Sequence, residues 1–549
     1  MSDWRDQVES ELNALTRRNT VDALWRRDPS AWTAPSPGGT PAGDATGWLD
    51  LPGRMAGLAD ELNGFTDDAR DDGFTDVILL GMGGSSLGPL VLGRVFGTAP
   101  GYPRLHVLDS TVPGQITAVR DRVDLHRSLF LVSSKSGTTI EPLTLANYFR
   151  GTLEEMGIEK PDAQFVALTD PGSSLEKMAV EREFRRVFNT PADVGGRFSV
   201  LSRFGLVPAA LIGVDLERLS RTAVEMATAC GPGVDPRNNP GALLGATLGG
   251  LAANGRDKVT ILTSPELASF GLWVEQLLAE STGKIGYGLV PVAGEPLYDA
   301  SAYGDDRNIV YLRLAGDDNG RTDAHADALE NAGHPVTRLE LDGRYDLGAE
   351  FFRWEFAVSV AATSISVYPF DQPDVESAKE FTRKLLASSG NTPQTLPGAM
   401  VLAEVVETVT QAKPGDYVAV LGYLPESANT DNAVSELRSA ITGRTGTATT
   451  SGYGPRYLHS TGQLHKGGPG GVIGLALVAG NEEALAAPRA GADGNQRTGY
   501  GFESLFVAQV LGDLEALRAQ GRRNTVAVLQ PPYADGIRAI AAALSATPY

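Results

Sequence analysis

The chain has 549 residues, 42% of them hydrophobic and 21% charged, a composition typical of a globular protein. Its length predicts three domain-sized units, or two with a large appendage. The formal charge of −20 argues against nucleic acid or anionic membranes as partners, since both require clustered Lys and Arg. No apolar run is long enough to cross a bilayer, and the segment Met1 to Arg18 lacks the apolar stretch of a secretory signal.

Cys230 is the only cysteine, which excludes an intrachain disulfide and fits a reducing compartment, so we expect a cytoplasmic location. The six histidines are too scattered to predict a metal site, and no cofactor is expected.

Residues 1–60 predict a helical arm: a helix, a Pro/Gly/Ala/Thr-rich loop over 34–47, and another helix. From Asp76 onward, short apolar strands alternate with longer helices, which predicts parallel sheets with helices on both faces. A first unit over 61–233 has expected strands at 77–80, 105–108, 129–132 and 165–168. A second over 234–400 has expected strands at 258–262, 309–314 and 337–341 and helices near 265–281, 348–366 and 373–387.

A third α/β module is expected over 401–549, and its stretch from Thr442 to Gly471 is the longest predicted loop. Its expected strands are 417–421, 472–478 and 525–529, and its expected helices lie near 427–440, 502–519 and 533–545. The predicted class is thus α/β, with two doubly wound parallel-sheet subdomains and a third module.

The glycine-serine loop from Gly81 to Gly88 follows the first strand and precedes an apolar helix. Such a loop lets backbone N–H groups and a helix N-terminus meet an anion. It matches neither the Walker pattern nor the dinucleotide fingerprint, whose third glycine is replaced by Ser86. Taken alone, a glycine cluster of this kind is more often an ordinary turn.

A second loop, Ser133-Ser-Lys-Ser-Gly-Thr-Thr139, occupies the same place after the strand at 129–132. The carboxyl ends of parallel strands are where open α/β sheets bind ligands. Hydroxyl groups and one lysine suit a phosphate monoester, although Ser and Thr also serve as helix caps.

Three further segments carry candidate catalytic groups. Arg197 follows two glycines and would approach a ligand with little hindrance, although a surface turn is the common place for such an arginine. Glu280 ends an apolar helical stripe one turn after Gln276, which suits a general base, whereas the alternative is a glutamate facing water. Gln372, Glu376 and Lys379 share one face at the helix near 373–387, where an exposed ion pair between Glu376 and Lys379 is the plain alternative.

Together these segments resemble phosphoglucose isomerase. They occur in the family's order, and Gly-Gly-Arg-Phe-Ser at 195–199 and Asp-Gln…Val-Glu…Lys at 371–379 are family signatures. The resemblance spans about residues 60–390, and the tail resembles that of the isomerase half of bifunctional transaldolase–phosphoglucose isomerases, without the transaldolase half.

The resemblance implies two sugar-isomerase (SIS) subdomains, a sugar-phosphate substrate and, since family members are commonly dimers, a homodimer. Glu280 would move a proton between C2 and C1, Arg197 would stabilise a cis-enediolate, and Gln276, Gln372 and Lys379 would hold substrate or assist ring opening. Phosphate binding is implied for Gly84, Ser85, Ser134, Lys135, Ser136 and Thr139.

Two departures from the family pattern matter. The family's ring-opening histidine follows a Gly-Glu-Pro segment, but the segment 294–300 here contains no histidine. Lys379 with water, His459 or His465 would have to fill the role, and we favour His465 as catalytic. Asp374 also replaces the usual glycine before Val375.

The sequence therefore favours a metal-independent isomerase of glucose 6-phosphate and fructose 6-phosphate. Two alternatives stay open at this point: an isomerase that also accepts mannose 6-phosphate, and a non-catalytic SIS-type sugar-phosphate sensor. The presence of both Glu280 and Arg197, and the absence of a basic recognition helix, argue against the sensor.

Overall fold

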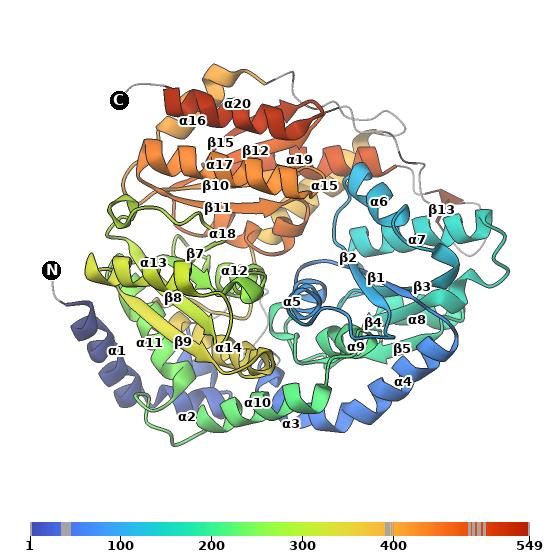
Figure 1. The fold of residues 1–549 in the computed structure, drawn as a ribbon, viewed down its shortest axis with the longest axis horizontal. Coiled ribbons are helices and arrows are strands. Elements are labelled where there is room, and N and C mark those ends of the chain that lie inside the picture. The colour runs from blue at the N-terminus through green and yellow to red at the C-terminus, as the bar shows by residue number, and fades with distance from the viewer. Residues whose placement is uncertain are drawn as a thin grey trace.

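The computed structural model describes residues 3–33, 45–389, 400–480 and 501–546, with residues 396, 398 and 485 and the two short strands at 489–490 and 496–497. In that part of the chain, three all-parallel sheets of four or five strands form the centres of three α/β units (Figure 1). The predicted α/β class is confirmed. Each sheet lies within one of the predicted ranges, while the boundaries between the units stay predictions.

The first sheet has the strand order β2-β1-β3-β4-β5. Every residue of β1 and β3 is buried, as expected for central strands of a parallel sheet that is covered on both faces. The chain leaves β1 toward β2 on one side and returns to β3 on the other, so the carboxyl ends of β1 and β3 border a crevice suited to a ligand. The elements are β1 (Asp76–Gly81), α5 (Leu87–Phe96), β2 (Arg104–Leu108), α6 (Pro113–Arg120), β3 (Ser128–Ser133), α7 (Ile140–Glu155), β4 (Phe165–Thr169), α8 (Ser174–Glu181) and β5 (Arg186–Asn189).

The second sheet has the order β7-β6-β8-β9, and helices α11 and α14 pack closely beside it. Glycines let these helices approach, because a Cβ at Gly245 would lie 2.6 Å from the Val360 side chain and one at Gly249 would lie 2.7 Å from that of Ser364. The elements are α11 (Pro240–Ala253), β6 (Lys258–Thr263), α12 (Phe270–Thr282), β7 (Val290–Ala293), β8 (Arg307–Leu314), α13 (Gly320–Asn331), β9 (Val336–Leu341) and α14 (Leu347–Ser364).

The third sheet has the order β11-β10-β12-β15, and β11 lies against β7 of the second unit. Helix α15 (Val375–Ser389) leaves the second unit and packs on α19 of the third, as Figure 1 shows. The other elements are α16 (Leu402–Thr410), β10 (Tyr417–Tyr423), α17 (Ala428–Thr445), β11 (Ala448–Tyr453), α18 (Gly462–Gly467), β12 (Val472–Ala479), α19 (Phe502–Ala519), β15 (Arg523–Leu529) and α20 (Tyr533–Ala546).

Three strands of these sheets that the sequence did not predict are all edge strands. β5 and β7 have only four residues each, too few to establish a pattern. β11 lies inside the stretch predicted to be a long loop, so that prediction is wrong. Its Thr-rich sequence reads as a loop, yet Thr449 and Thr450 are buried, and β-branched Thr fits a strand packed on one side.

The N-terminal arm packs on the first two units and shares their hydrophobic core. Trp25 donates its indole N–H to the Cys230 carbonyl at 2.7 Å, and Trp32 donates to the Ser359 carbonyl at 2.9 Å. Among the described residues, no helix is long and apolar enough to cross a membrane. The helices of the arm and of the segment linking the units are α1 (Trp4–Arg18), α2 (Thr20–Trp25), α3 (Leu51–Met55), α4 (Ala59–Asp71), α9 (Arg203–Leu211) and α10 (Leu216–Ala229).

Candidate active site

A cavity of about 970 Å³ opens at the carboxyl ends of β1 and β3. Its opposite walls come from α12, from α15 and from the short helical turn 456–459 of the third module. Ten of the residues predicted for the site line this cavity: Gly84, Ser85, Lys135, Ser136, Thr139, Arg197, Gln276, Glu280, Gln372 and Lys379.

The first glycine loop is held by contacts that leave no room for side chains. Gly83 has a left-handed φ of +54°, and a Cβ on Gly84 would lie 1.9 Å from the Gly196 carbonyl oxygen. The loop forms a single 3-10 turn from Gly83 to Ser85, and α5 begins two residues later. The backbone of this loop therefore faces the cavity directly beside the turn that carries Arg197.

The second loop joins β3 to α7 and holds its own hydroxyl groups in place. Ser134 does not line the cavity itself, but its hydroxyl donates to the Thr139 hydroxyl at 3.0 Å. Lys135 forms an ion pair with Asp170 and donates to the Ala192 carbonyl at 3.1 Å. A phosphate at this loop would thus meet a lysine already oriented by a carboxylate.

Arg197 is almost completely buried at 3% exposure, yet its guanidinium reaches the cavity wall. Its Nε donates to the Ser281 hydroxyl at 2.7 Å, and its Nη2 donates to the carbonyls of Pro369 at 2.5 Å and Asp371 at 3.2 Å. Its Nη1 donates to Gln372 Oε1 at 3.0 Å. Burial lowers the pKa of Arg197 from its ordinary value, so the neighbouring acceptors have to compensate the buried charge.

Glu280 lies beside this guanidinium at the end of α12, with its Oε1 3.4 Å from Arg197 Nη1. Gln276, one turn earlier, donates from Nε2 to Glu280 Oε2 at 3.0 Å and to the His459 carbonyl at 2.9 Å. The carboxylate is therefore oriented from two sides and still lines the cavity. This arrangement can place a base next to a group that stabilises negative charge.

The two histidines that the sequence left open lie in different surroundings. His459 lines the cavity, and its Nε2 lies 2.9 Å from Glu141 Oε1. His465, which we favoured, is absent from the cavity lining: it is buried at 2% exposure, with Nδ1 3.0 Å from the Tyr417 hydroxyl. Burial lowers the pKa of His465 to about 3, so this ring stays neutral in the core of the third module. The expectation that His465 reaches the cavity is therefore wrong, and His459 is the histidine that lines it.

The sequence reasoning missed two residues that support His459. Glu141, in the first turn of α7, accepts from Gln509 Nε2 at 2.7 Å on the oxygen that faces His459. Burial acts to raise the pKa of Glu141, but His459 and then Lys379 hold it below its ordinary value. An acidic residue directly after a hydroxyl-rich loop was a signal for Glu141, whereas nothing in the sequence pointed to Gln509 on α19.

The unusual Asp374 before α15 has a partner in the third module. Gln463 donates from Nε2 to Asp374 Oδ2 at 2.6 Å, and its Oε1 accepts from the Asp374 backbone N–H at 2.9 Å. Gln463 Nε2 also donates to the Gly283 carbonyl at 2.9 Å. The residue that departs from the family pattern thus fastens the start of α15 to the third module.

Known proteins resemble this chain in the same region. The family model described as phosphoglucose isomerase matches residues 58–286. The glucose-6-phosphate isomerase of Rubrobacter xylanophilus is 31% identical over 405 residues, which cover 64% of this chain and 91% of that protein. A probable glucose-6-phosphate isomerase of Methanococcus maripaludis is 29% identical over 384 residues, covering 62% of this chain and 84% of that protein.

Solved structures share the fold. A hypothetical protein of Thermus thermophilus has a TM-score of 0.60 at 24% identity, covering 70% of this chain and 98% of that one. A glucose-6-phosphate isomerase of Chlamydia trachomatis has a TM-score of 0.60 at 18% identity, covering 69% of this chain and 86% of that one. These structures show the fold, and the relative that is 31% identical and covered over 91% of its length shows that the chain belongs to the phosphoglucose isomerase family.

Proposed function

We propose that the protein interconverts glucose 6-phosphate and fructose 6-phosphate by proton transfer through a cis-enediolate. One observation carries the proposal: the Glu280 carboxylate lies 3.4 Å from the buried Arg197 guanidinium, in a cavity that is also lined by the two loops predicted to bind an anion. A base, a charge-stabilising group and a phosphate site are the three elements that this isomerisation needs. The homodimeric state and cytoplasmic location expected from the sequence belong to the same proposal.

The phosphate would anchor the substrate away from the reacting carbons. The loop residues Gly84 and Ser85, the N-terminal end of α7 and the hydroxyl-bearing residues Ser136 and Thr139 line that part of the cavity. Lys135 would add one positive charge. This anchoring would use binding energy remote from the reaction to fix C1 and C2 next to Glu280.

His459 would open the sugar ring before the proton transfer. Because Glu141 is held in its ionised form, it accepts a hydrogen bond from His459 Nε2, and this leaves Nδ1 as the basic nitrogen. Nδ1 would take the proton of the C1 hydroxyl as the C1–O5 bond breaks, and the resulting imidazolium would return that proton to O5, which gives the open-chain aldehyde. Lys379 also lines the cavity and would hold the substrate during this step.

Glu280 would then take the proton from C2 of the open-chain aldose. The electrons of the C–H bond form the C1–C2 double bond of the enediolate, whose oxygen charge Arg197 would stabilise. Glu280 returns the proton to C1, and the hydroxyl proton passes from O2 to O1, giving the ketose. Gln276 keeps the carboxylate in line through its hydrogen bond to Oε2.

The test is turnover of the purified full chain on fructose 6-phosphate, read by a glucose-6-phosphate dehydrogenase that reduces NADP. We expect steady production of glucose 6-phosphate that survives a metal chelator. Saturable binding of fructose 6-phosphate without turnover would instead identify a sensor and refute the proposal.

A matched pair of variants assigns the ring-opening step. His459→Asn should lower kcat on the cyclic sugar by about 10²-fold or more, since general acid–base groups contribute that much. His465→Asn, in the core of the third module, should keep the wild-type kcat. The reverse ranking would show that His459 is not the ring-opening group.

A further inference from the structure

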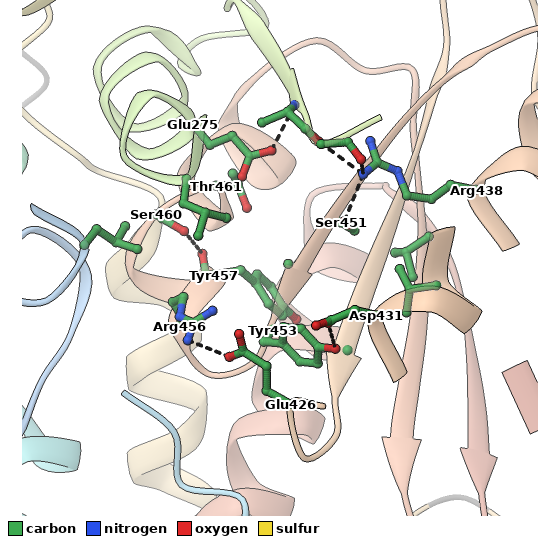
Figure 2. A pocket seen from close by; sticks show the side chains of 18 of the residues that line it. Glu275, Glu426, Asp431, Arg438, Ser451, Tyr453, Arg456, Tyr457, Ser460 and Thr461 are labelled. Atoms are coloured by element: carbon green, nitrogen blue, oxygen red, sulfur yellow. Dashed lines mark hydrogen bonds and ion pairs between the residues drawn. The ribbon is translucent and has the colours of Figure 1, made fainter. Parts of the chain in front are cut away.

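A second cavity, of about 260 Å³, lies at the carboxyl ends of β10 and β11 in the third module. Figure 2 shows it enclosed by side chains of α17, of β11 and of the turn that follows β11, with Glu275 of α12 above. Nothing in the isomerase reaction uses this cavity. Its lining residues Glu275 and Ser460 are the chain neighbours of Gln276 and His459, which line the active-site cavity. The two cavities therefore lie on opposite sides of the same two segments.

Its position in the fold is the one where parallel sheets bind ligands. In the sheet order β11-β10-β12-β15, the chain passes from β10 to β11 on one side and then to β12 on the other. The strand order therefore reverses at β10, and ligands of open α/β sheets bind outside the carboxyl ends of the strands at such a point. Gly422 at the end of β10 and Gly452 and Tyr453 at the end of β11 line the cavity there.

Arg438 of α17 brings a buried positive charge to this cavity, at 3% exposure. It makes five hydrogen bonds, and all of their acceptors are uncharged: the Thr449 hydroxyl and carbonyl, the carbonyls of Ala293 and Gly294, and the Ser451 hydroxyl. No carboxylate of the described residues lies within ion-pair distance of it, although Glu275 is close enough for Arg438 to act on its pKa. A buried charge without a counter-ion is costly, so an anionic group of a ligand would be stabilised here.

Glu275 is the carboxyl group best placed to serve as a counter-ion for Arg438, but it does not do so at neutral pH. Its Oε1 accepts from the Ala293 backbone N–H at 3.3 Å. Burial raises the pKa of Glu275 to about 8, although Arg438 acts in the opposite direction. Most Glu275 side chains are therefore protonated near pH 7, and the group is available as a hydrogen-bond donor to a ligand carboxylate.

The other charges at the cavity divide into paired and unpaired ones. Glu426 pairs with Arg94 at 3.0 Å and with Arg456 at 2.9 Å, and Arg456 also pairs with Asp109 at 2.7 Å, so these two arginines and two carboxylates balance one another. Asp431, at the exposed mouth, accepts only from the Tyr453 hydroxyl at 2.5 Å, and within the described chain it forms no ion pair. Burial raises the pKa of Asp431, and Arg94 and Arg456 act in the opposite direction without lying within ion-pair distance of its carboxylate.

We propose that this cavity binds a small zwitterion of the amino-acid class, with its carboxylate toward Arg438 and its ammonium toward Asp431. The two residues are seven apart on α17, so they lie on one face with their Cα atoms about 10 Å apart along the axis. Figure 2 shows both side chains on the α17 side of the same hollow. The volume is below the range for nucleotide- or drug-sized ligands, which suits a ligand of this size.

Calorimetry on the full chain tests the proposal directly, without relying on isomerase activity. The probes are a panel of free α-amino acids, the matched carboxylic acids that lack the ammonium, and the matched amines that lack the carboxylate. Saturable heats from one or more amino acids, with none from their single-charge counterparts, support the site. Heats from none of the probes, or equal binding of an amino acid and its deaminated acid, would overturn it.

Variants at the exposed mouth place the ligand without disturbing the core. Asp431→Asn keeps the hydrogen bond from Tyr453 but removes the charge, and it should weaken binding about tenfold or more. Ser435→Trp should fill the mouth and abolish binding. Glu436→Gln is the matched control, because Glu436 is on the same helix and pairs with Arg538 away from the cavity. Binding that persists in Ser435→Trp would refute this location.

Discussion

Lys284, a buried lysine that does not line the active-site cavity, is expected to position Arg197. Its Nζ donates to the Tyr368 carbonyl at 2.6 Å and pairs with Asp371 Oδ1 at 2.8 Å. The same segment gives Arg197 two of its acceptors, the carbonyls of Pro369 and Asp371. Lys284 and Arg197 therefore hold this segment from two sides, and the loss of one should displace the other.

The perturbation is Lys284→Met, which keeps most of the side-chain volume and removes the ammonium. Breaking this buried ion pair removes the ammonium that faces the Asp371 carboxylate, which is 4% exposed, and should lower the free energy of unfolding by about 3–5 kcal/mol. A displacement of Arg197 of roughly 1 Å should lower kcat by about 10²-fold. KM should change much less, because the two loops that we propose to bind the phosphate belong to the first unit and, within the described chain, form no hydrogen bond or ion pair with Lys284.

Lys258→Met is the matched control for lost stability alone. Lys258 is buried to the same degree, with its Nζ 2.7 Å from Asp257 Oδ1 and 2.6 Å from the Gly415 carbonyl, and it does not line the active-site cavity. Both variants should unfold at lower urea concentration. The assay is kcat and KM for fructose 6-phosphate under conditions where both are folded. Equal kcat values in the two variants would refute the positioning role.

Two further predictions test the glycine loop and the buried histidine. Gly84→Ala should raise KM and lower kcat together in the coupled assay, because the added Cβ would collide with the Gly196 carbonyl. An unchanged KM would contradict this packing. His465 has a pKa of about 3 in the folded protein, below its value of 6.5 in the unfolded chain. Between pH 6.5 and pH 3 the unfolded chain therefore binds more protons than the folded protein, and the free energy of unfolding falls as the pH falls through this range. His465→Gln should remove this loss of stability, which is at most about 5 kcal/mol. If the denaturation midpoints of the wild type and the variant fall by the same amount between pH 7 and pH 4, the prediction is wrong.

Most of the fold could be predicted because the central strands and long helices have strong patterns. The buried runs of β1 and β3, and helices such as α14 and α19, lie within a few residues of their expected positions. The edge strands were missed because a strand of four residues, or one rich in Thr and Gly, looks like a loop without its neighbour. Their pairing is decided by tertiary packing.

Residues of the candidate site could be brought together from the sequence where they follow strands of the first unit or share one face of a helix. Glu280 and Gln276 are one turn apart, so a helical pattern was enough to join them. The choice between His459 and His465 was out of reach, since both belong to one short segment. Only the packing of the third module decides that His459 reaches Glu141 and His465 reaches Tyr417.

The third module thus contributes residues to the candidate active site. Gln509 of α19 holds Glu141, Gln463 holds Asp374, and His459 enters the cavity. This answers in part why the module exists: it supplies a histidine at a place where the segment 294–300 has none.

The most direct test of the proposed mechanism is Glu280→Gln, which keeps the shape and the hydrogen bond from Gln276 but removes the base. Turnover of fructose 6-phosphate should fall by about 10²- to 10⁴-fold, while calorimetric binding of the same sugar phosphate stays near that of the wild type. Wild-type turnover by this variant would contradict the assignment of Glu280 as the base.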